Sequence, residues 1–320
     1  MTIKEVAEYL RTHDNYLILT HRRPDGDTIG CAAALGTMLR QMGKNAGVLY
    51  NRETTEHFAP YIEELWVADD FGYETVVSVD LAALSLFPDN AEQFKTKVDL
   101  AIDHHPSYEH FGKLDCVHPE CAACGEVIYE IAVELGQLTG AVALPLYVAV
   151  STDTGCFVYS NVTANTHRVA AALLETGIDY KAANKLHFRT KSKKRIELEG
   201  ELLRTMEFYD ENRIVIVVLP QELQQRLALT EADMEDISAL GGVVEGTDCS
   251  ITMKETKGGA WKISLRTGAR VNATRACAML GGGGHRAASG CVIEHATFSD
   301  ARRMILNAVE KAVQEENNAH

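Results

Sequence analysis

At 320 residues the chain exceeds the usual size of one domain, and its 46% of apolar residues can bury two cores, so we expect two domains. The formal net charge of −14 argues against binding of long duplex nucleic acid, which would need a broad basic surface. The sequence shows neither a run of 18 apolar residues nor a secretory signal pattern, and its eight cysteines are scattered, so we expect a cytoplasmic protein with reduced thiols and no membrane contact.

The first part of the chain alternates predicted helices with predicted strands. Thr2 can cap a helix over 3–10, a buried strand over 16–20 follows, and a helix is expected from about 27 to 42. An amphipathic helix is expected over 125–136. Further strands are predicted at 45–50, 74–80 and 98–102, and the apolar stretch Leu144–Ser151 is interpreted as another strand. This alternation predicts an α/β fold with a doubly wound, mostly parallel sheet.

Polar side chains follow these apolar segments. The first strand runs into a loop with His21, Asp25 and Asp27, and for this loop alone the alternative is a turn in which Asp27 caps a helix. Because parallel strands end at one edge of a sheet, the polar residues after the other strands should join this loop. The expected cluster consists of His21, Asp25, Asp27, Asp80, His104, His105 and Asp153.

Four carboxylates so close together would repel one another unless divalent cations neutralised them, so the cluster predicts two bound metal ions. Mixed oxygen and imidazole ligands favour manganese, with magnesium or cobalt as alternatives, over structural zinc. Two such ions can activate a water molecule for hydrolysis of phosphate esters. Cys121 and Cys124 have C-x-x-C spacing but no second pair follows, so a zinc or redox role is not favoured.

The second part of the chain has a different composition. We expect a metal-binding domain over 1–188, a charged helical linker over 189–210, and a smaller α/β domain with a mixed sheet over 211–320. The active site is expected in the cleft between the domains. Within the last domain we predict a strand at 213–219, a hairpin of strands 249–255 and 260–267, and a helix at about 272–280.

Four glycines, Gly281–Gly284, follow this last helix and precede His285 and Arg286. The run is neither a Walker A loop nor a dinucleotide fingerprint, because no Lys-Ser/Thr pair follows it and no strand precedes it. Glycine amides can approach an anion closely while the two side chains donate to it, and Arg266 could add a guanidinium. The alternative is a flexible loop. The basic cluster from Lys181 to Arg195 is interpreted as a solvated helix start.

Taken together, the motifs resemble the DHH phosphoesterase superfamily, and the resemblance covers nearly the whole chain. Within it the chain is similar to two-domain members with a DHH-associated C-terminal domain, of the oligoribonuclease (nanoRNase) and phosphoadenosine phosphate phosphatase type. One departure is Cys31, where such proteins often have serine. The motifs that carry the resemblance are His21-x-x-Pro-Asp25-Gly-Asp27, Asp80, Asp103-His104-His105, Asp153-Thr-Gly and Gly-Gly-Gly-Gly-His285.

The resemblance implies a role for each of these residues. Asp80 would bridge the two metals, His105 would face the substrate phosphate, and Asp103 would orient the histidines. The first metal would be bound by His21, Asp25 and Asp80, and the second by Asp27, Asp80, His104 and Asp153. The substrate would be held by Arg266, Gly282, Gly283, Gly284, His285 and Arg286.

The implied activity is hydrolysis of very short RNA to nucleoside monophosphates, and also of the 3′-phosphate of adenosine 3′,5′-bisphosphate. A linear or cyclic dinucleotide phosphodiesterase is the alternative, since it would share every metal ligand. A manganese-type inorganic pyrophosphatase and a non-catalytic nucleotide sensor are less favoured. The expected partners are short single-stranded RNA or small nucleotides, and a homodimer is compatible with the sequence.

Overall fold

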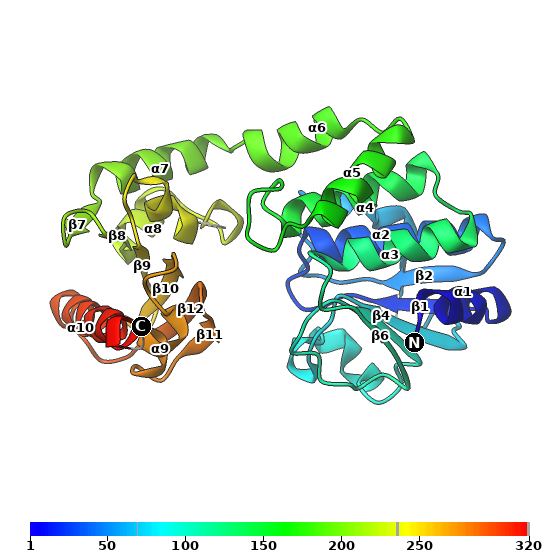
Figure 1. Ribbon diagram of the computed structural model, residues 1–320, viewed down its shortest axis with the longest axis horizontal. Helices are drawn as coiled ribbons and strands as arrows, with labels where there is room; N and C mark the ends of the chain where they lie inside the picture. The colour runs from blue at the N-terminus through cyan, green and yellow to red at the C-terminus, as the bar shows by residue number, and fades with distance from the viewer. Residues whose placement is uncertain (69, 235–236, 319–320) are drawn as a thin grey trace. The chain divides into compact units, whose positions relative to one another are not determined.

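The structure is a computed structural model that describes residues 1–68, 70–234 and 237–318 (Figure 1). It divides into two compact units, the first from Met1 to Thr190 and the second from Lys191 onward. The last two residues of the expected C-terminal domain, 319–320, lie outside the described residues. Each unit has its own sheet and its own cores.

Six parallel strands form the sheet of the first unit, in the order β3-β2-β1-β4-β5-β6. Their bounds are Tyr16–Leu19 for β1, Ala46–Leu49 for β2, Trp66–Val67 for β3, Thr75–Val79 for β4, Leu100–Asp103 for β5 and Leu114–Val117 for β6. The strand order reverses between β1 and β4. In open parallel sheets ligands bind beyond the carboxyl ends of the strands at such a reversal.

The central strands are buried along their whole length because both faces of the sheet are covered (Figure 1). The main core lies between the sheet and four helices: α1 Ile3–Thr12, α2 Gly26–Gln41, α3 Cys124–Leu135 and α4 Gly140–Asp153. The 3₁₀ helices Leu84–Leu86 and Asp89–Phe94 follow β4, and the second contributes to the core of the other face. The unit also contains 3₁₀ helices Ala59–Tyr61 and Glu63–Leu65, helices α5 Ala164–Glu175 and α6 Tyr180–Asn184, and a π-helical turn Lys185–Arg189.

Local sequence signals explain several helix ends. Thr2 caps α1 in a reciprocal arrangement with Glu5, as the sequence predicted. Gly136 ends α3 in the left-handed conformation that glycine adopts without steric cost. These ends fix where the chain turns back toward the sheet.

The stretch Leu144–Ser151 was expected as a strand, and this prediction is wrong, because it forms most of α4. A short apolar run does not distinguish a buried strand from a buried helix. Residues of α4 are buried on nearly every side, so the helix shows no polar face that would reveal its period. Asp153 therefore comes from the end of a helix that packs on α2 and α3, and not from a strand end.

Glycine lets α2 and α4 approach closely. A Cβ at Gly30 would lie 2.3 Å from the carbonyl oxygen of Pro145, and a Cβ at Gly26 would lie 2.2 Å from Oγ1 of Thr152. Larger residues at either glycine would separate the helices. The close approach brings the C-terminal end of α4, with Asp153, beside the beginning of α2.

The sheet of the second unit is mixed, with the order β11-β12-β10-β9-β8-β7. Only β8 and β9 pair in parallel, and the other neighbours are antiparallel. The expected hairpin is confirmed as β9 and β10. The strands are Glu207–Tyr209 for β7, Ile214–Leu219 for β8, Cys249–Glu255 for β9, Trp261–Thr267 for β10, Gly283–His285 for β11 and Ala288–Ile293 for β12.

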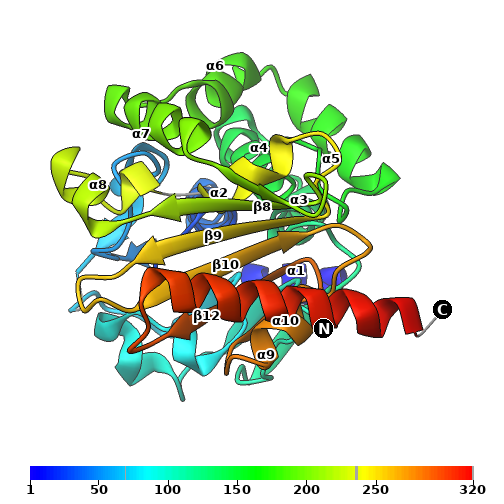
Figure 2. The same ribbon diagram turned by 90° about the vertical axis from the view of Figure 1, so that its left-hand side faces the viewer.

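Helices cover both faces of this sheet (Figure 2). One core contains α9 Ala273–Ala278 and α10 Phe298–Asn318, and the other contains α7 Lys193–Arg204 and α8 Gln221–Arg226. Two 3₁₀ helices, Ala232–Met234 and Ile237–Val243, complete the unit. Across the three described ranges, no helix combines the length and apolar character needed to cross a membrane.

The segment expected as a linker, 189–210, contains α7. Leu198 and Leu202 of this helix are fully buried in one cluster with Val217 and Leu219 of β8. By these contacts α7 is packed onto the second unit, whose contact boundary lies at Lys191.

Candidate metal centre

The loop between β1 and α2 supplies the first polar groups. Oδ1 of Asp25 accepts hydrogen bonds from the amides of Asp27 and Thr28, at 3.0 and 3.2 Å, so Asp25 caps α2. The alternative interpretation of this loop expected a cap from Asp27, and the structure assigns the cap to Asp25. Nε2 of His21 lies 3.6 Å from Oδ1 of the capping carboxylate.

Asp27 lies in the first turn of α2, and its side chain is buried. Its carboxylate accepts from the amides of Cys124 and Gly125, at 2.7 and 2.9 Å, which are the first two residues of α3. The thiol of Cys31 also donates to Oδ1 of Asp27, at 3.2 Å. Amide dipoles at a helix N-terminus favour a negative charge, so this arrangement holds Asp27 as an oriented carboxylate.

Asp80 follows β4, at the reversal of strand order. Its backbone has a φ of 51°, an uncommon conformation for a residue with a side chain, and such strain is often found at functional sites. The side chain is 3% exposed, and Oδ1 has no hydrogen-bond partner in the described parts of the chain. Asp80 lies 3.7 Å from Nε2 of His21 and 3.7 Å from Nε2 of His104, one histidine on each carboxylate oxygen.

Backbone carbonyls fix the tautomers of His21 and His104. Nδ1 of His21 lies 2.8 Å from the carbonyl oxygen of Arg22, and Nδ1 of His104 lies 3.1 Å from that of Cys121. A carbonyl only accepts, so each Nδ1 carries the proton and each Nε2 presents its lone pair. Both lone pairs face Asp80, which is the arrangement that metal-ligating histidines need.

His105 and Asp103 form a pair beside the cluster. Oδ1 of Asp103 accepts from Nδ1 of His105 at 2.8 Å and from the amides of His104 and His105 at 2.6 and 2.7 Å. Burial disfavours the charged imidazole, but the hydrogen bond and charge of Asp103, with more distant carboxylates, outweigh it and raise the pKa of His105. With 38% of its side chain exposed, His105 is open to solvent, whereas Asp103 is buried.

Three carboxylates of the cluster, those of Asp27, Asp80 and Asp153, carry raised pKa values. Burial, followed by the charges of Asp27 and Asp25, raises the pKa of Asp80 well above its usual range. The same causes raise the pKa of Asp153 to about 8. Burial also raises the pKa of Asp27, although His104 opposes it. Bringing these groups together as anions therefore requires a compensating positive charge.

The predicted residues at this edge come together in three groups whose potential ligand atoms all lie within 4.8 Å of one another. No cysteine belongs to any of these groups within the described residues. The oxygen and imidazole donors, with the unpartnered Oδ1 of Asp80, fit divalent cations. The groups are His21, Asp25 and Asp80; Asp27, His104 and Asp153; and Asp80, His104 and His105.

The residues expected to hold the substrate lie in the second unit, on β10, β11 and the turn before β12. Arg266 pairs with Ala288 of β12, and Ala288 pairs with His285 of β11. Residues directly opposite in antiparallel strands point to the same face, so Arg266 and His285 share one face. Both are exposed, and this is the face opposite the core that contains Leu265.

The rest of the expected substrate set makes internal contacts. Both Nη atoms of Arg286 donate to Glu316 of α10 at 3.1 Å, and Nη2 also donates to the carbonyl of Ala269. The amide of Gly282 donates to the carbonyl of Cys277. Gly283 and Gly284 pair with β12 as part of β11. The glycine run is therefore an ordered connection between α9 and the sheet, and not a flexible loop.

Sequence reasoning missed the backbone donors of the site. The amides of Cys124 and Gly125 were found only from coordinates, although the small residues before α3 were a signal that its N-terminus could approach another group. It also missed Asn51, whose Nδ2 donates to Oγ1 of Thr20 and to the carbonyl of His21, at 3.1 and 2.9 Å. An asparagine directly after a strand of this edge was the available signal.

This geometry defines a class of protein: an α/β fold with a carboxylate and imidazole centre at the strand reversal. The chain matches the DHH family, N-terminal domain, over residues 15–150. It is 31% identical over 315 residues to the bifunctional oligoribonuclease and PAP phosphatase NrnA of Thermus thermophilus, covering 96% of this chain and 93% of the relative. The chain belongs to the DHH family and, within it, to the group of the NrnA proteins.

Two further likenesses agree with this assignment. A probable bifunctional oligoribonuclease and PAP phosphatase NrnA of Streptococcus mutans is 26% identical, covering 90% of this chain and 92% of that one. The crystal structure of an exopolyphosphatase-related protein from Bacteroides fragilis superposes with a TM-score of 0.89, at 23% identity, covering 98% of this chain and 97% of the other. At that identity the structural likeness shows the fold.

Proposed function

We propose that this chain is a metal-dependent phosphoesterase that hydrolyses short oligoribonucleotides to nucleoside monophosphates and removes the 3′-phosphate of adenosine 3′,5′-bisphosphate. The observation that carries the proposal is the buried Asp80, which lies between His21 and His104 at the strand reversal. A carboxylate so placed destabilises the fold unless it binds cations. The relatives along nearly the whole chain are oligoribonucleases and PAP phosphatases by name.

Two divalent ions fit the donor set, and manganese is favoured, with magnesium or cobalt as alternatives. When bound, the ions would neutralise the carboxylates, activate a water molecule and stabilise charge on the phosphate. His21, Asp25 and Asp80 would hold one ion. The other would be held by Asp27, Asp80, His104 and Asp153.

His105 is proposed to bind the substrate phosphate. Asp103 accepts the Nδ1 proton, so Nε2 is the atom that His105 presents outward. The raised pKa favours a proton on Nε2 as well, which makes His105 a cationic donor to a phosphate oxygen. Asp103 is a positioning residue, because it holds the ring and both adjacent amides.

Arg266 and His285 are proposed to contact the substrate from the second unit. They share a face of the sheet and are exposed, and both can donate to an anion. Arg286 is better explained by its bidentate contact with Glu316, so we assign it a structural role.

The test is a hydrolysis panel with protein stripped by a chelator and reloaded with manganese, magnesium or cobalt. The substrates are a diribonucleotide, a longer RNA, adenosine 3′,5′-bisphosphate, cyclic dinucleotides and pyrophosphate. We expect turnover of the diribonucleotide and of adenosine 3′,5′-bisphosphate, turnover of the longer RNA that is no more efficient than that of the diribonucleotide, and none in chelator. Turnover of cyclic dinucleotides or pyrophosphate alone would overturn the proposal.

A further inference from the structure

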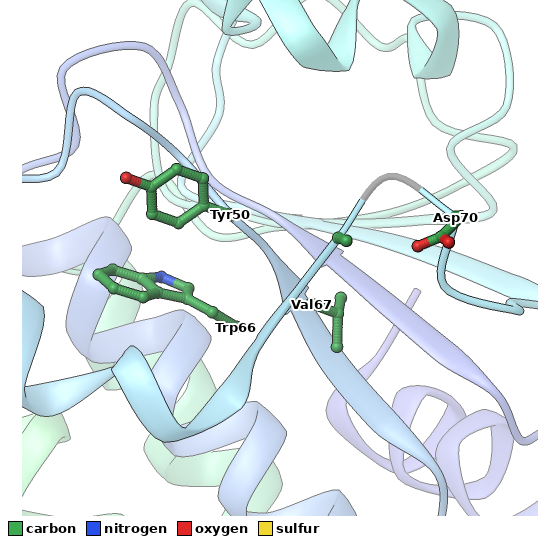
Figure 3. A pocket seen from close by; sticks show the side chains of 5 residues that line it. Tyr50, Trp66, Val67 and Asp70 are labelled. Carbon is green, nitrogen blue, oxygen red and sulfur yellow. The ribbon is translucent and has the colours of Figure 1, made fainter.

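A hollow of about 650 Å³ opens at the carboxyl ends of β2 and β3, outside the metal centre (Figure 3). Two aromatic rings meet there at 5.0 Å between centroids and an interplanar angle of 87°. Tyr50 is 48% exposed, although a tyrosine gains stability mainly by burial. The hollow is shallow and largely open to solvent. The hollow is lined by Tyr50, Trp66, Val67, Ala68 and Asp70.

Hydrogen bonds join this hollow to the metal centre. Asn51, the next residue after Tyr50, donates to the carbonyl of His21, and Oδ1 of Asn51 accepts from the amide of Glu53. Oε2 of Glu53 in turn accepts from the amide of Arg23. The loop after β2 is thus fastened to the loop after β1 at the metal ligand His21.

The distance suits one nucleotide. Tyr50 follows β2, which lies two strand spacings from β4, the strand that Asp80 follows, and Trp66 lies one spacing further out on β3. Two spacings amount to roughly 10 Å. The segment between carries arginines: Arg23 and Arg52 are exposed, in a chain that is otherwise strongly acidic. A nucleotide with its phosphate at the metal centre and its base on the aromatic rings would pass this positive charge.

We propose that Tyr50 and Trp66 bind a nucleobase of the substrate, the base nearest the scissile phosphate. This rests on the proposed function and adds a base-recognition site to it. Every base has a π-face, so stacking on the rings would tolerate any sequence. Asp70 supplies an exposed carboxylate that can accept from an exocyclic amine or a ribose hydroxyl. Binding of the base at this site would make the enzyme prefer nucleotides over simple phosphate esters.

Tryptophan fluorescence tests base binding without any turnover. The sequence has two tryptophans, and Trp261 is 5% exposed in the core of the second unit, so only Trp66 can meet a ligand at this hollow. In magnesium, adenosine 5′-monophosphate should quench the emission saturably, whereas ribose 5-phosphate should not. The quench should vanish in Trp66→Phe. In Tyr50→Ala the dissociation constant should rise about tenfold, the loss of one stacking contact.

A control variant and a second substrate complete the test. Phe208→Ala removes a half-exposed ring from β7 and should bind the monophosphate as the parent protein does. In Tyr50→Ala, kcat/KM should fall about tenfold for a diribonucleotide and stay unchanged for the same backbone with an abasic residue. Unchanged binding in Tyr50→Ala, or a quench that survives Trp66→Phe, would overturn the proposal.

The outcomes separate this proposal from the function on which it rests. Binding of the monophosphate at Trp66 without hydrolysis of any nucleotide would refute the enzyme and keep the base site. Hydrolysis of nucleotides with no fluorescence change would keep the enzyme and refute the base site. If Tyr50→Ala instead dissociated a dimer, seen by sedimentation, and the monophosphate had no effect, the hollow would be a contact between two copies of the chain and the base site would be refuted.

Discussion

Polar residues lie together at the carboxyl edge of the first sheet and at the β10–β12–β11 end of the second sheet, but they affect the stability of the fold differently. At the first edge, Asp80 and Asp103 are buried, and each has an oxygen without a hydrogen-bond partner in the described residues. In the second unit, Arg286 is paired with Glu316, Gly282 is partly buried, and the remaining predicted residues are exposed.

This difference distinguishes residues that are present for function from residues that are present for folding. Unpaired buried carboxylates destabilise a folded chain, so their presence needs a ligand to explain it. A paired surface arginine and a close-packed glycine are explained by the fold alone. We therefore propose that the first unit carries the chemistry, and among the described residues predicted to bind substrate in the second unit, Arg266 and His285 lack a structural explanation.

Asp80→Asn should lower kcat by at least about a thousandfold, because no neighbour can replace a carboxylate shared by both proposed ions. The metal-free variant should remain folded and unfold at a higher temperature than the parent, since a repelling buried charge is gone. Glu92→Gln, on the surface beside Lys95, is the matched control and should leave both quantities unchanged. Near-normal turnover of Asp80→Asn at saturating manganese would exclude the two-metal assignment.

Gly282→Ala should destabilise the second unit by about 2–3 kcal/mol, because its Cβ would lie 2.2 Å from the carbonyl oxygen of Gly290. Gly283→Ala is the control, since a Cβ there meets nothing within 4 Å. Urea unfolding followed by Trp261 emission in a Trp66→Phe background reports on this unit. Equal midpoints for the two variants would show that the close approach is not required. A raised KM in Gly283→Ala would restore an anion-binding role to the glycine run.

Asp153→Asn should stabilise the metal-free protein at high pH. The pKa of Asp153 is about 8 in the fold, above its value in the unfolded chain, so its protonated form favours folding at low pH and this contribution is lost as pH rises toward 8. We expect a gain of roughly 4–6 kcal/mol at pH 8.5, about 1.4 kcal/mol for each unit by which the pKa is raised, that disappears near pH 4. Thermal unfolding in chelator across this range is the measurement. A gain that did not depend on pH would contradict it.

Arg266→Ala and His285→Ala should each raise KM for a diribonucleotide about tenfold with little change in kcat, as expected for groups that hold the substrate away from the reacting bond. Arg286→Ala should leave KM unchanged and lower the thermal unfolding temperature, because it releases Glu316 of α10. Steady-state kinetics of all three variants measure KM and kcat, and thermal unfolding measures their stability. If His285→Ala lost metal binding, His285 would be a metal ligand and its assignment to the substrate-binding residues would be wrong.

The sequence predicted the polar cluster well because strand ends in a parallel sheet share an edge, whatever the details of packing. His21, Asp80 and His104 follow strands that were all identified, and the strands β1, β2, β4 and β5 were found within two residues of their bounds. Asp153 was assigned to the right cluster from the wrong element, since an apolar run hides its period when every side is buried.

Other features depend on contacts between distant segments, which no local pattern records. The two-residue strand β3 forms only by pairing with β2, and the amides of α3 reach Asp27 only through the packing of α2 on α3. The contact of Arg286 with Glu316 could not be predicted for the same reason, because Glu316 lies 30 residues further along the chain. Charge and composition show the guanidinium but not its carboxylate partner, so substrate binding by Arg286 stays a prediction.

The last prediction concerns the length of the RNA. The part of the basic cluster that lies in the second unit is paired with carboxylates: Lys191 and Arg195 contact Glu199 at 2.7 Å, and Lys193 lies 3.7 Å from Glu197. With 45 acidic residues against 31 basic ones, extra phosphates would meet little compensating charge.

We therefore expect kcat/KM to change less than about threefold between RNAs of three and about twenty nucleotides, the upper length chosen to exceed a site of roughly 4 to 16 nucleotides. The salt dependence should be shallow, with a log–log slope near −2 for about three phosphate contacts. Single-turnover cleavage at several salt concentrations measures both. The double variant Lys181→Ala and Lys185→Ala should behave as the parent protein does. A contrary result would be a cleavage efficiency that rises with RNA length, a salt slope that steepens with it, and loss of this rise in the double variant. The basic cluster would then bind the RNA strand, and the comparison of a catalytic first unit with a mainly structural second unit would be wrong.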